Sequence, residues 1–201
     1  MKLTSYIALL GVMFLLTACP PSRRSNYQSN LKQVKKNGMD LPNLQTERYE
    51  GIEYQLSNLF THDYDDDYVK TDYASTKCIY DMNIHFSVEM FDQNDAEATS
   101  YAFDEEIDLL NAVHDDYILI REESLENEQT SIKKEVPASV GYPGYIQIVH
   151  GAPSTYGERS SYFTATLEVD DEYYVFQLIG KEENMGYMYD DFIDIISSVQ
   201  K

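Results

Sequence analysis

The chain has 201 residues, enough for one domain with a hydrophobic core, and it contains 18 Tyr but no Trp. Its formal net charge of −20 at pH 7 argues against nucleic acid as a partner, because binding phosphates requires a basic face. The same acidity favours solubility and cationic partners, including divalent metal ions.

The first 18 residues have the pattern of a secretory signal peptide. Lys2 supplies a positive charge, residues 7–16 form an apolar run too short for a mature membrane span, and Leu16-Thr17-Ala18-Cys19 follows. This end resembles the lipobox of bacterial lipoproteins, and the resemblance implies cleavage before Cys19, diacylglycerol on its sulfur and palmitate-type acylation of its amine. An ordinary signal peptide with a chance cysteine is the alternative.

Residues 19–46 are predicted to be a flexible tether and residues 47–201 a single acidic domain. The tether is basic, with Arg23, Arg24, Lys32, Lys35 and Lys36, whereas residues 47–201 carry 34 acidic and 9 basic side chains, a formal charge of −25. The tether can lie on anionic headgroups or act only as a spacer. Pro20-Pro21 lacks the Asp typical of inner-membrane retention, which favours the outer membrane, facing the periplasm.

Alternation of apolar and polar residues predicts strands in the first half of the domain. A short strand is expected around residues 52–56, then a charged loop at residues 62–72. Residues 78–91 alternate so regularly that one long strand is predicted, with a bend or bulge because it would extend ~40 Å. Cys78 on its apolar face is expected to be a small buried hydrophobe.

A helix is predicted over residues 96–114, capped by Asn94 or Asp95. Its apolar stripe is Phe103, Ile107, Leu110 and His114, and His114 is interpreted as a helix C-terminal residue rather than a ligand. Further predicted elements are strands at residues 117–120, 131–136 and 145–150, a loop at 121–130, a hairpin of residues 161–169 and 173–179, and a last helix over 188–199.

This order predicts an α+β domain: a mostly antiparallel sheet of about six strands with two main helices packed on it. Its FSVEMF strand, GYPG turn, YFTATLEVDDEYYVFQLIG hairpin and FIDIISSV helix resemble those of the PsbP-like proteins and the DcrB-like lipoproteins, over residues 49–199. The resemblance implies an α/β/α sandwich and a binding or assembly role. It carries over no functional residue.

Motifs for catalysis are absent from the sequence: there is no nucleophile elbow, H-E-x-x-H, C-x-x-C or phosphate-binding loop. The acidic run offers Asp63, Asp65 and Asp67 as candidate calcium ligands. An EF-hand beginning at Asp63 would need Gly and Glu where Tyr68 and Ala74 stand, so a solvated loop is the alternative. Tyrosines around residues 142–162 are consistent with sheet packing or with a binding patch.

The sequence therefore predicts a non-enzymatic lipoprotein of the bacterial envelope, without cofactors, that is anchored through Cys19 and binds another protein. The alternative is a module that binds calcium or a small ligand. An enzyme whose site is assembled from dispersed residues is the third hypothesis.

Overall fold

The computed structural model describes residues 44–58, 60–62, 74–79, 84–100, 108–153, 157–186 and 188–201. An eight-stranded antiparallel sheet has the order β3-β4-β5-β10-β9-β8-β6, with β7 beside β8, and β1 and β2 form a separate two-stranded sheet. The strands are β1 (Leu44–Tyr49), β2 (Ile52–Ser57), β3 (Thr61–His62), β4 (Ala74–Ile79), β5 (Ile84–Phe91), β6 (Glu126–Thr130), β7 (Lys134–Glu135), β8 (Gly144–Ala152), β9 (Ser160–Val169) and β10 (Glu172–Lys181). The helices are α4 (Gln93–Ser100), α5 (Leu109–Ser124), η3 (Ala138–Val140), α6 (Glu182–Met185) and α7 (Tyr189–Ser197).

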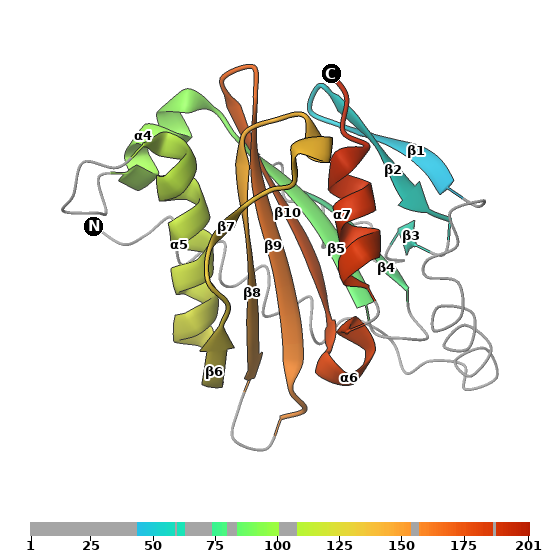
Figure 1. Cartoon of the computed structure of the whole chain (residues 1–201), viewed down its shortest axis with the longest axis vertical. Coiled ribbons are helices and arrows are strands. Elements are labelled where there is room, and N and C mark those ends of the chain that lie inside the picture. Colours follow the sequence, from blue (N-terminus) through green and yellow to red (C-terminus); the bar gives the residue numbers. More distant parts are fainter. Residues whose placement is uncertain are drawn as a thin grey trace.

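Helices α4 and α5 cover one face of the large sheet, while α7 and the β1–β2 hairpin cover the other (Figure 1). The predicted α+β class, with a mostly antiparallel sheet and two main helices, is confirmed. The large sheet has more strands than the six predicted because β3 and β7 are two-residue pairings. Strand β1 begins at Leu44, so three residues assigned to the tether lie in a strand.

The larger hydrophobic core lies between the sheet and α7. Alternate residues of the central strands point into it, and the rings of Tyr54, Phe86 and Phe176 pack against one another with centroids 5.7–6.4 Å apart. Aromatic pairs in this distance range add to the stability from burial alone. Helix α7 buries Phe192, Ile195 and Ile196 there, as its predicted apolar stripe requires.

The β9–β10 hairpin is the best-predicted element of the fold. Its register pairs Val169 with Glu172, which leaves a two-residue turn of Asp170 and Asp171. Both turn residues have positive φ, 50° and 65°, as expected for the turn type that matches the twist of a hairpin. Strand β8 pairs with β9 on its other side, close to the predicted strand at residues 145–150.

The long strand predicted over residues 78–91 is wrong. Strands β4 and β5 are two arms of an antiparallel pair, in which Cys78 lies opposite His85. The alternating pattern runs through both arms, and alternation shows only that residues are extended, not that the chain keeps its direction. Residues 80–83 and the side chain of Cys78 lie outside the described part of the structure.

The helix predicted over residues 96–114 is helical at residues 96–100, in α4, and at 109–114, in α5, while Phe103 and Ile107 of its predicted stripe lie outside the described residues. Helix α4 is capped by Asp92, which accepts from the Asp95 amide, and α5 by Asp108, which accepts from the Asn111 amide. Helix α5 then continues through the predicted strand at residues 117–120 and into the predicted loop. Tyr117 and Ile118 are buried in it, so packing on the sheet outweighs the β-propensity of the YILI sequence.

Strand β6 occupies the rest of the predicted loop at residues 121–130. Its pairing with β8 shifts register between Glu126 and Gln129, and Asn127 has a φ of 53°. The predicted strand at residues 131–136 is reduced to the short β7. Within the described ranges, no helix has the length and apolar character needed to cross a membrane.

Candidate functional site

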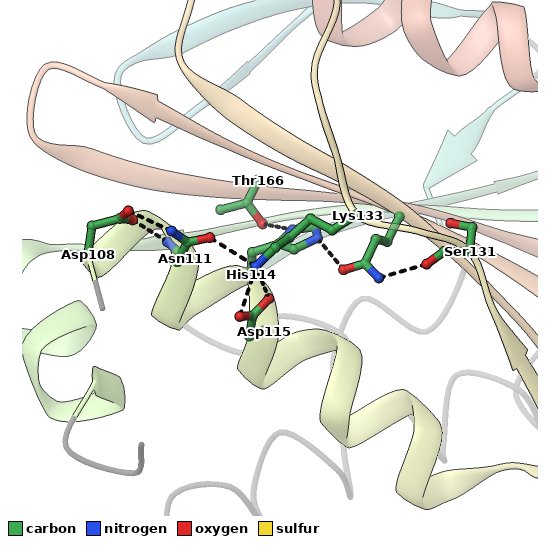
Figure 2. Close-up of polar contacts among 8 residues, drawn as sticks. Asp108, Asn111, His114, Asp115, Ser131, Lys133 and Thr166 are labelled. Atoms are coloured by element: carbon green, nitrogen blue, oxygen red, sulfur yellow. Dashed lines mark hydrogen bonds and ion pairs between the residues drawn. The ribbon is translucent and has the colours of Figure 1, made fainter. Parts of the chain in front are cut away.

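Helix α5 and the residues that link β6 to β7 are joined by Lys133. The Lys133 ammonium donates to both Asp115 carboxylate oxygens at 2.7 and 2.9 Å and to the Asn111 side-chain carbonyl at 2.9 Å (Figure 2). It also lies 5.2 Å from the centre of the Tyr145 ring, within the range of a cation–π contact. These four contacts hold Lys133 between α5 and β8.

Ser131 fixes the same segment to the edge of the sheet. Its amide donates to the Ile148 carbonyl and its hydroxyl accepts from the Ile148 amide, at 2.8 and 2.9 Å. The Gln147 side chain donates to the Ser131 carbonyl at 2.9 Å. The residue between these two anchors, Ile132, is therefore held in place although it packs little: 83% of it is exposed.

His114 connects this network to the buried face of α5. Gln147 uses its nitrogen for Ser131, so its oxygen accepts from the imidazole Nε2 at 3.1 Å, and the Thr166 hydroxyl donates to Nδ1 at 3.0 Å. These roles describe a neutral imidazole, the form that burial favours. Burial lowers the pKa of His114 to about 4, in agreement with the hydrogen bonds. The predicted C-terminal helix position is wrong, because α5 continues for ten further residues.

A second buried polar group lies further along α5. Arg121 is 4% exposed, and its guanidinium donates to the side-chain oxygen of Gln177 at 2.7 Å. The guanidinium also lies 5.2 Å from the centre of the Tyr162 ring. Gln177 in turn donates to Thr164. We call the buried side chains that line α5 between the two apolar clusters the polar belt: His114, Gln147, Thr164, Thr166, Gln177 and Arg121.

Glu89 lies at the margin of the polar belt. It is largely buried and accepts a hydrogen bond from the Tyr117 hydroxyl. Burial raises the pKa of Glu89 to about 7, although the nearby charge of Arg121 acts in the opposite direction. The carboxyl group is therefore near its titration midpoint at neutral pH. Burial also lowers the pKa of Arg121.

A shallow depression of about 360 Å³ lies on the solvent side of this network. It is lined by Asp115, Ile118, Leu119, Glu122, Lys133 and Gln147. Leu119 is 45% exposed, and with Ile132 it is one of three large hydrophobic residues exposed in the described part of the chain. We call this depression, together with Ile132, the chain neighbour of its lining residue Lys133, the α5 surface. Its volume falls in the range of roughly 300–1,000 Å³ that holds a small ligand or a few side chains.

The residues predicted as the lipid anchor and as calcium ligands fall outside the described part of the chain. Cys19, Asp63, Asp65 and Asp67 lie outside the described residues, so the lipid anchor and the calcium loop remain predictions. Among the described residues, no group of three His, Cys, Asp or Glu is placed to hold a metal ion. His150 bonds the Ser161 hydroxyl at 2.7 Å, away from His114.

Tyr142, Tyr145 and Tyr162, the described tyrosines of residues 142–162, pack against the fold. Tyr162 is buried beneath Arg121, and Tyr145 is half-buried between Lys133 and His114, 5.9 Å from the imidazole. Sequence reasoning missed Ile132 and Leu119 as surface residues, because both lay inside predicted strands. The sequence could have indicated the exposure of Ile132 only through its polar neighbours Ser131 and Lys133. An apolar residue between two polar ones is also the pattern of a strand with one buried face, so this signal does not identify a surface residue.

Comparisons with known proteins identify the fold but no family. No protein-family model and no curated protein matches the sequence. Among solved structures, the Ran-binding protein Mog1p from Saccharomyces cerevisiae has a TM-score of 0.54 at 11% identity, covering 79% of this chain and 95% of that one. A mutant of Mog1 gives a TM-score of 0.56, also at 11% identity and with the same coverage.

The cyanobacterial PsbP protein of Synechocystis sp. PCC 6803 is also similar in structure. Its TM-score is 0.50 at 13% identity, covering 81% of this chain and 95% of that one. The predicted resemblance to PsbP-like proteins is thus supported at the level of the fold. At these identities the likeness concerns the fold alone, and it transfers no site residue.

Proposed function

We propose that this chain is a lipid-anchored protein of the bacterial envelope, without enzymatic activity, whose acidic α+β domain binds another protein through the α5 surface. The observation that carries the proposal is Ile132, an isoleucine that is 83% exposed and yet held by contacts on both sides. An apolar side chain exposed in the folded protein has an unfavourable hydration free energy and adds nothing to the burial of the core. A partner that covers it supplies the compensating burial.

The architecture around the α5 surface supports binding rather than chemistry. His114 has no exposed surface and both of its ring nitrogens are hydrogen-bonded, so a substrate in the depression does not reach it. The similar structures include a protein described as Ran-binding, which agrees with a binding role for this fold.

The proposed anchor is Cys19, and the proposed location is the outer membrane, facing the periplasm. Residues 20–43 separate the cysteine from the first described strand. Fully extended, those 24 residues reach at most ~85 Å. That length allows the domain to meet a partner well away from the lipid surface, while the acyl chains, at ~0.8 kcal/mol per buried CH₂, retain it at the membrane.

Cys19→Ala is expected to abolish incorporation of a clickable fatty-acid analogue, because it removes the thiol that receives the lipid. The matched control is Cys78→Ala, which removes the only other cysteine and should leave labelling intact. The measurement is in-gel fluorescence of the immunoprecipitated chain. Labelling that persists in Cys19→Ala would exclude this anchor.

A photoreactive amino acid at position 132 is expected to give a discrete protein adduct in cells of the organism that encodes the chain. The matched control is position 44, because Leu44 is also an exposed apolar residue, 38% exposed, but lies on β1 at the opposite face of the sheet (Figure 1). The adduct at position 132 should fall at least about fivefold when Leu119→Ser is added. Equal adducts at both positions, or none at position 132, would contradict binding through the α5 surface.

A further inference from the structure

The α5 surface is bordered by carboxylates. Asp115 and Glu122 line the depression, α5 also carries Asp116 and Glu123, and the adjoining strand β6 carries Glu126 and Glu128. The basic side chains of this region are fewer: Lys133 is paired with Asp115, Arg121 is buried, Lys134 lies on β7, and Arg159 donates to the Asn127 carbonyl of β6 while it is paired with Glu182. Leu119 on α5 and Ile132, the residue before Lys133, are therefore exposed apolar residues in a region where carboxylates outnumber basic side chains.

From this arrangement we infer that the partner presents a basic amphipathic segment, with apolar side chains that cover Leu119 and Ile132 and Lys or Arg side chains that meet the surrounding carboxylates. The inference rests on the proposed function and specifies the chemistry of its partner. Charge complementarity of this kind raises association rates and rejects partners of the wrong sign.

The charges in the free protein are not already balanced. Asp116 and Glu123 are seven residues apart on α5, about two helical turns, and so share one side of the helix. Partial burial raises the pKa of Asp116, and the charge of Glu123 raises it further. A Lys or Arg placed between them would reduce this repulsion, which is the gain expected when a cationic segment binds.

Other occupants fit this surface less well. A second copy of the chain would bring two acidic surfaces together, and the net charge of −20 opposes that association. An anionic lipid surface would be repelled for the same reason. The chain's own residues 31–36 carry Leu31 and Val34 among three lysines and thus have suitable chemistry. That segment is the competing occupant, and the experiment below distinguishes it from a partner.

The test uses the full chain in nanodiscs of zwitterionic lipid, with the photoreactive amino acid at position 132 or, as the control, at position 44. The probe is a fluorescent 14-residue peptide of Leu at helical spacing and Lys elsewhere. A matched peptide replaces every Lys with Glu. Site-specific adducts are quantified after illumination, so binding of the peptide to lipid does not contribute to the readout.

The Lys peptide is expected to label position 132 at least about tenfold more than position 44, and about tenfold more than the Glu peptide does. Glu122→Lys combined with Glu123→Lys should reduce the adduct about fivefold, as should 0.5 M salt. Three results would each overturn the inference: equal labelling by the two peptides, no peptide adduct at position 132, or an intramolecular adduct to residues 19–43. If the cellular protein adduct at position 132 persists in any of these cases, the proposed function stands and only the chemistry of the partner is wrong.

Discussion

Glu89→Gln is expected to stabilise the protein by about 3 kcal/mol at pH 8 and to have little effect near pH 4.5. Burial raises the pKa of Glu89 from its ordinary 4.5 to about 7, so ionising this carboxyl in the folded state is unfavourable. Glutamine keeps an oxygen that accepts from the Tyr117 hydroxyl but cannot ionise. The variant therefore retains the contact with α5 and removes the cost of the charge.

The sign of the effect follows from the number of protons bound. Between pH 4.5 and 7 the folded state binds more protons at Glu89 than the unfolded state, so the stability from this group is lost as pH rises through about 7. His114 acts in the opposite direction, because burial lowers its pKa to about 4 and its folded form binds fewer protons between about pH 4 and 6.5. In the wild-type protein, the contributions of Glu89 and His114 to the pH dependence of the free energy of unfolding therefore have opposite signs.

Urea unfolding at intervals from pH 4.5 to pH 8 measures this prediction. The wild-type free energy of unfolding should change little between pH 4.5 and 6.5, whereas that of Glu89→Gln should rise with pH as the His114 contribution becomes visible. Glu128→Gln on β6 is the control, because it removes one carboxylate from an exposed position. A constant difference between Glu89→Gln and wild type at every pH would show that the ionisation of Glu89 is not the cause.

Gly144→Ala is expected to destabilise the fold by about 3 kcal/mol. A Cβ atom at this position would lie 2.4 Å from the Thr166 carbonyl oxygen and 2.7 Å from Cδ2 of Leu167. The carbonyl belongs to the backbone of β9 and cannot move without displacing the centre of the sheet. The Gly144 carbonyl also accepts from the Val136 amide, so relieving the clash would disturb that contact too.

Gly186→Ala is the matched control for Gly144→Ala. A Cβ atom there has no neighbour within 4 Å, and the backbone is right-handed with φ of −57°. Thermal unfolding followed by circular dichroism should show a Tm lower by roughly 6–12 °C for Gly144→Ala, at about 2–4 °C per kcal/mol for a chain of this size. Gly186→Ala should stay within about 2 °C of wild type. Similar losses in both variants would refute the close approach at Gly144.

Elements whose local and tertiary signals agree could be predicted from the sequence. The β9–β10 hairpin combines alternating apolar residues with Asp170-Asp171, a pair that tolerates positive φ, and α7 carries its buried stripe at helical spacing. In both cases the same residues that favour the local structure also form the core. The fold class followed from the order of such elements.

The prediction was wrong where local and tertiary signals conflict. Tyr117, Ile118 and their neighbours have strand propensity, but α5 gains more by continuing its buried face along the sheet. The α5 surface could not be predicted from the sequence for a related reason. It depends on Lys133 meeting Asp115 and on Ser131 meeting Ile148, pairs 17–18 residues apart whose contact only the folded chain reveals.

The irregular β6 also affects how readily the protein associates with copies of itself. Strands at the edge of a sheet present unpaired amides and carbonyls that can recruit the same strand of a neighbouring molecule into a growing aggregate. The register shift, the positive φ of Asn127 and the acidic side chains of Glu126 and Glu128 make β6 a poor template for such recruitment. Self-polymerisation through this edge of the sheet is therefore disfavoured.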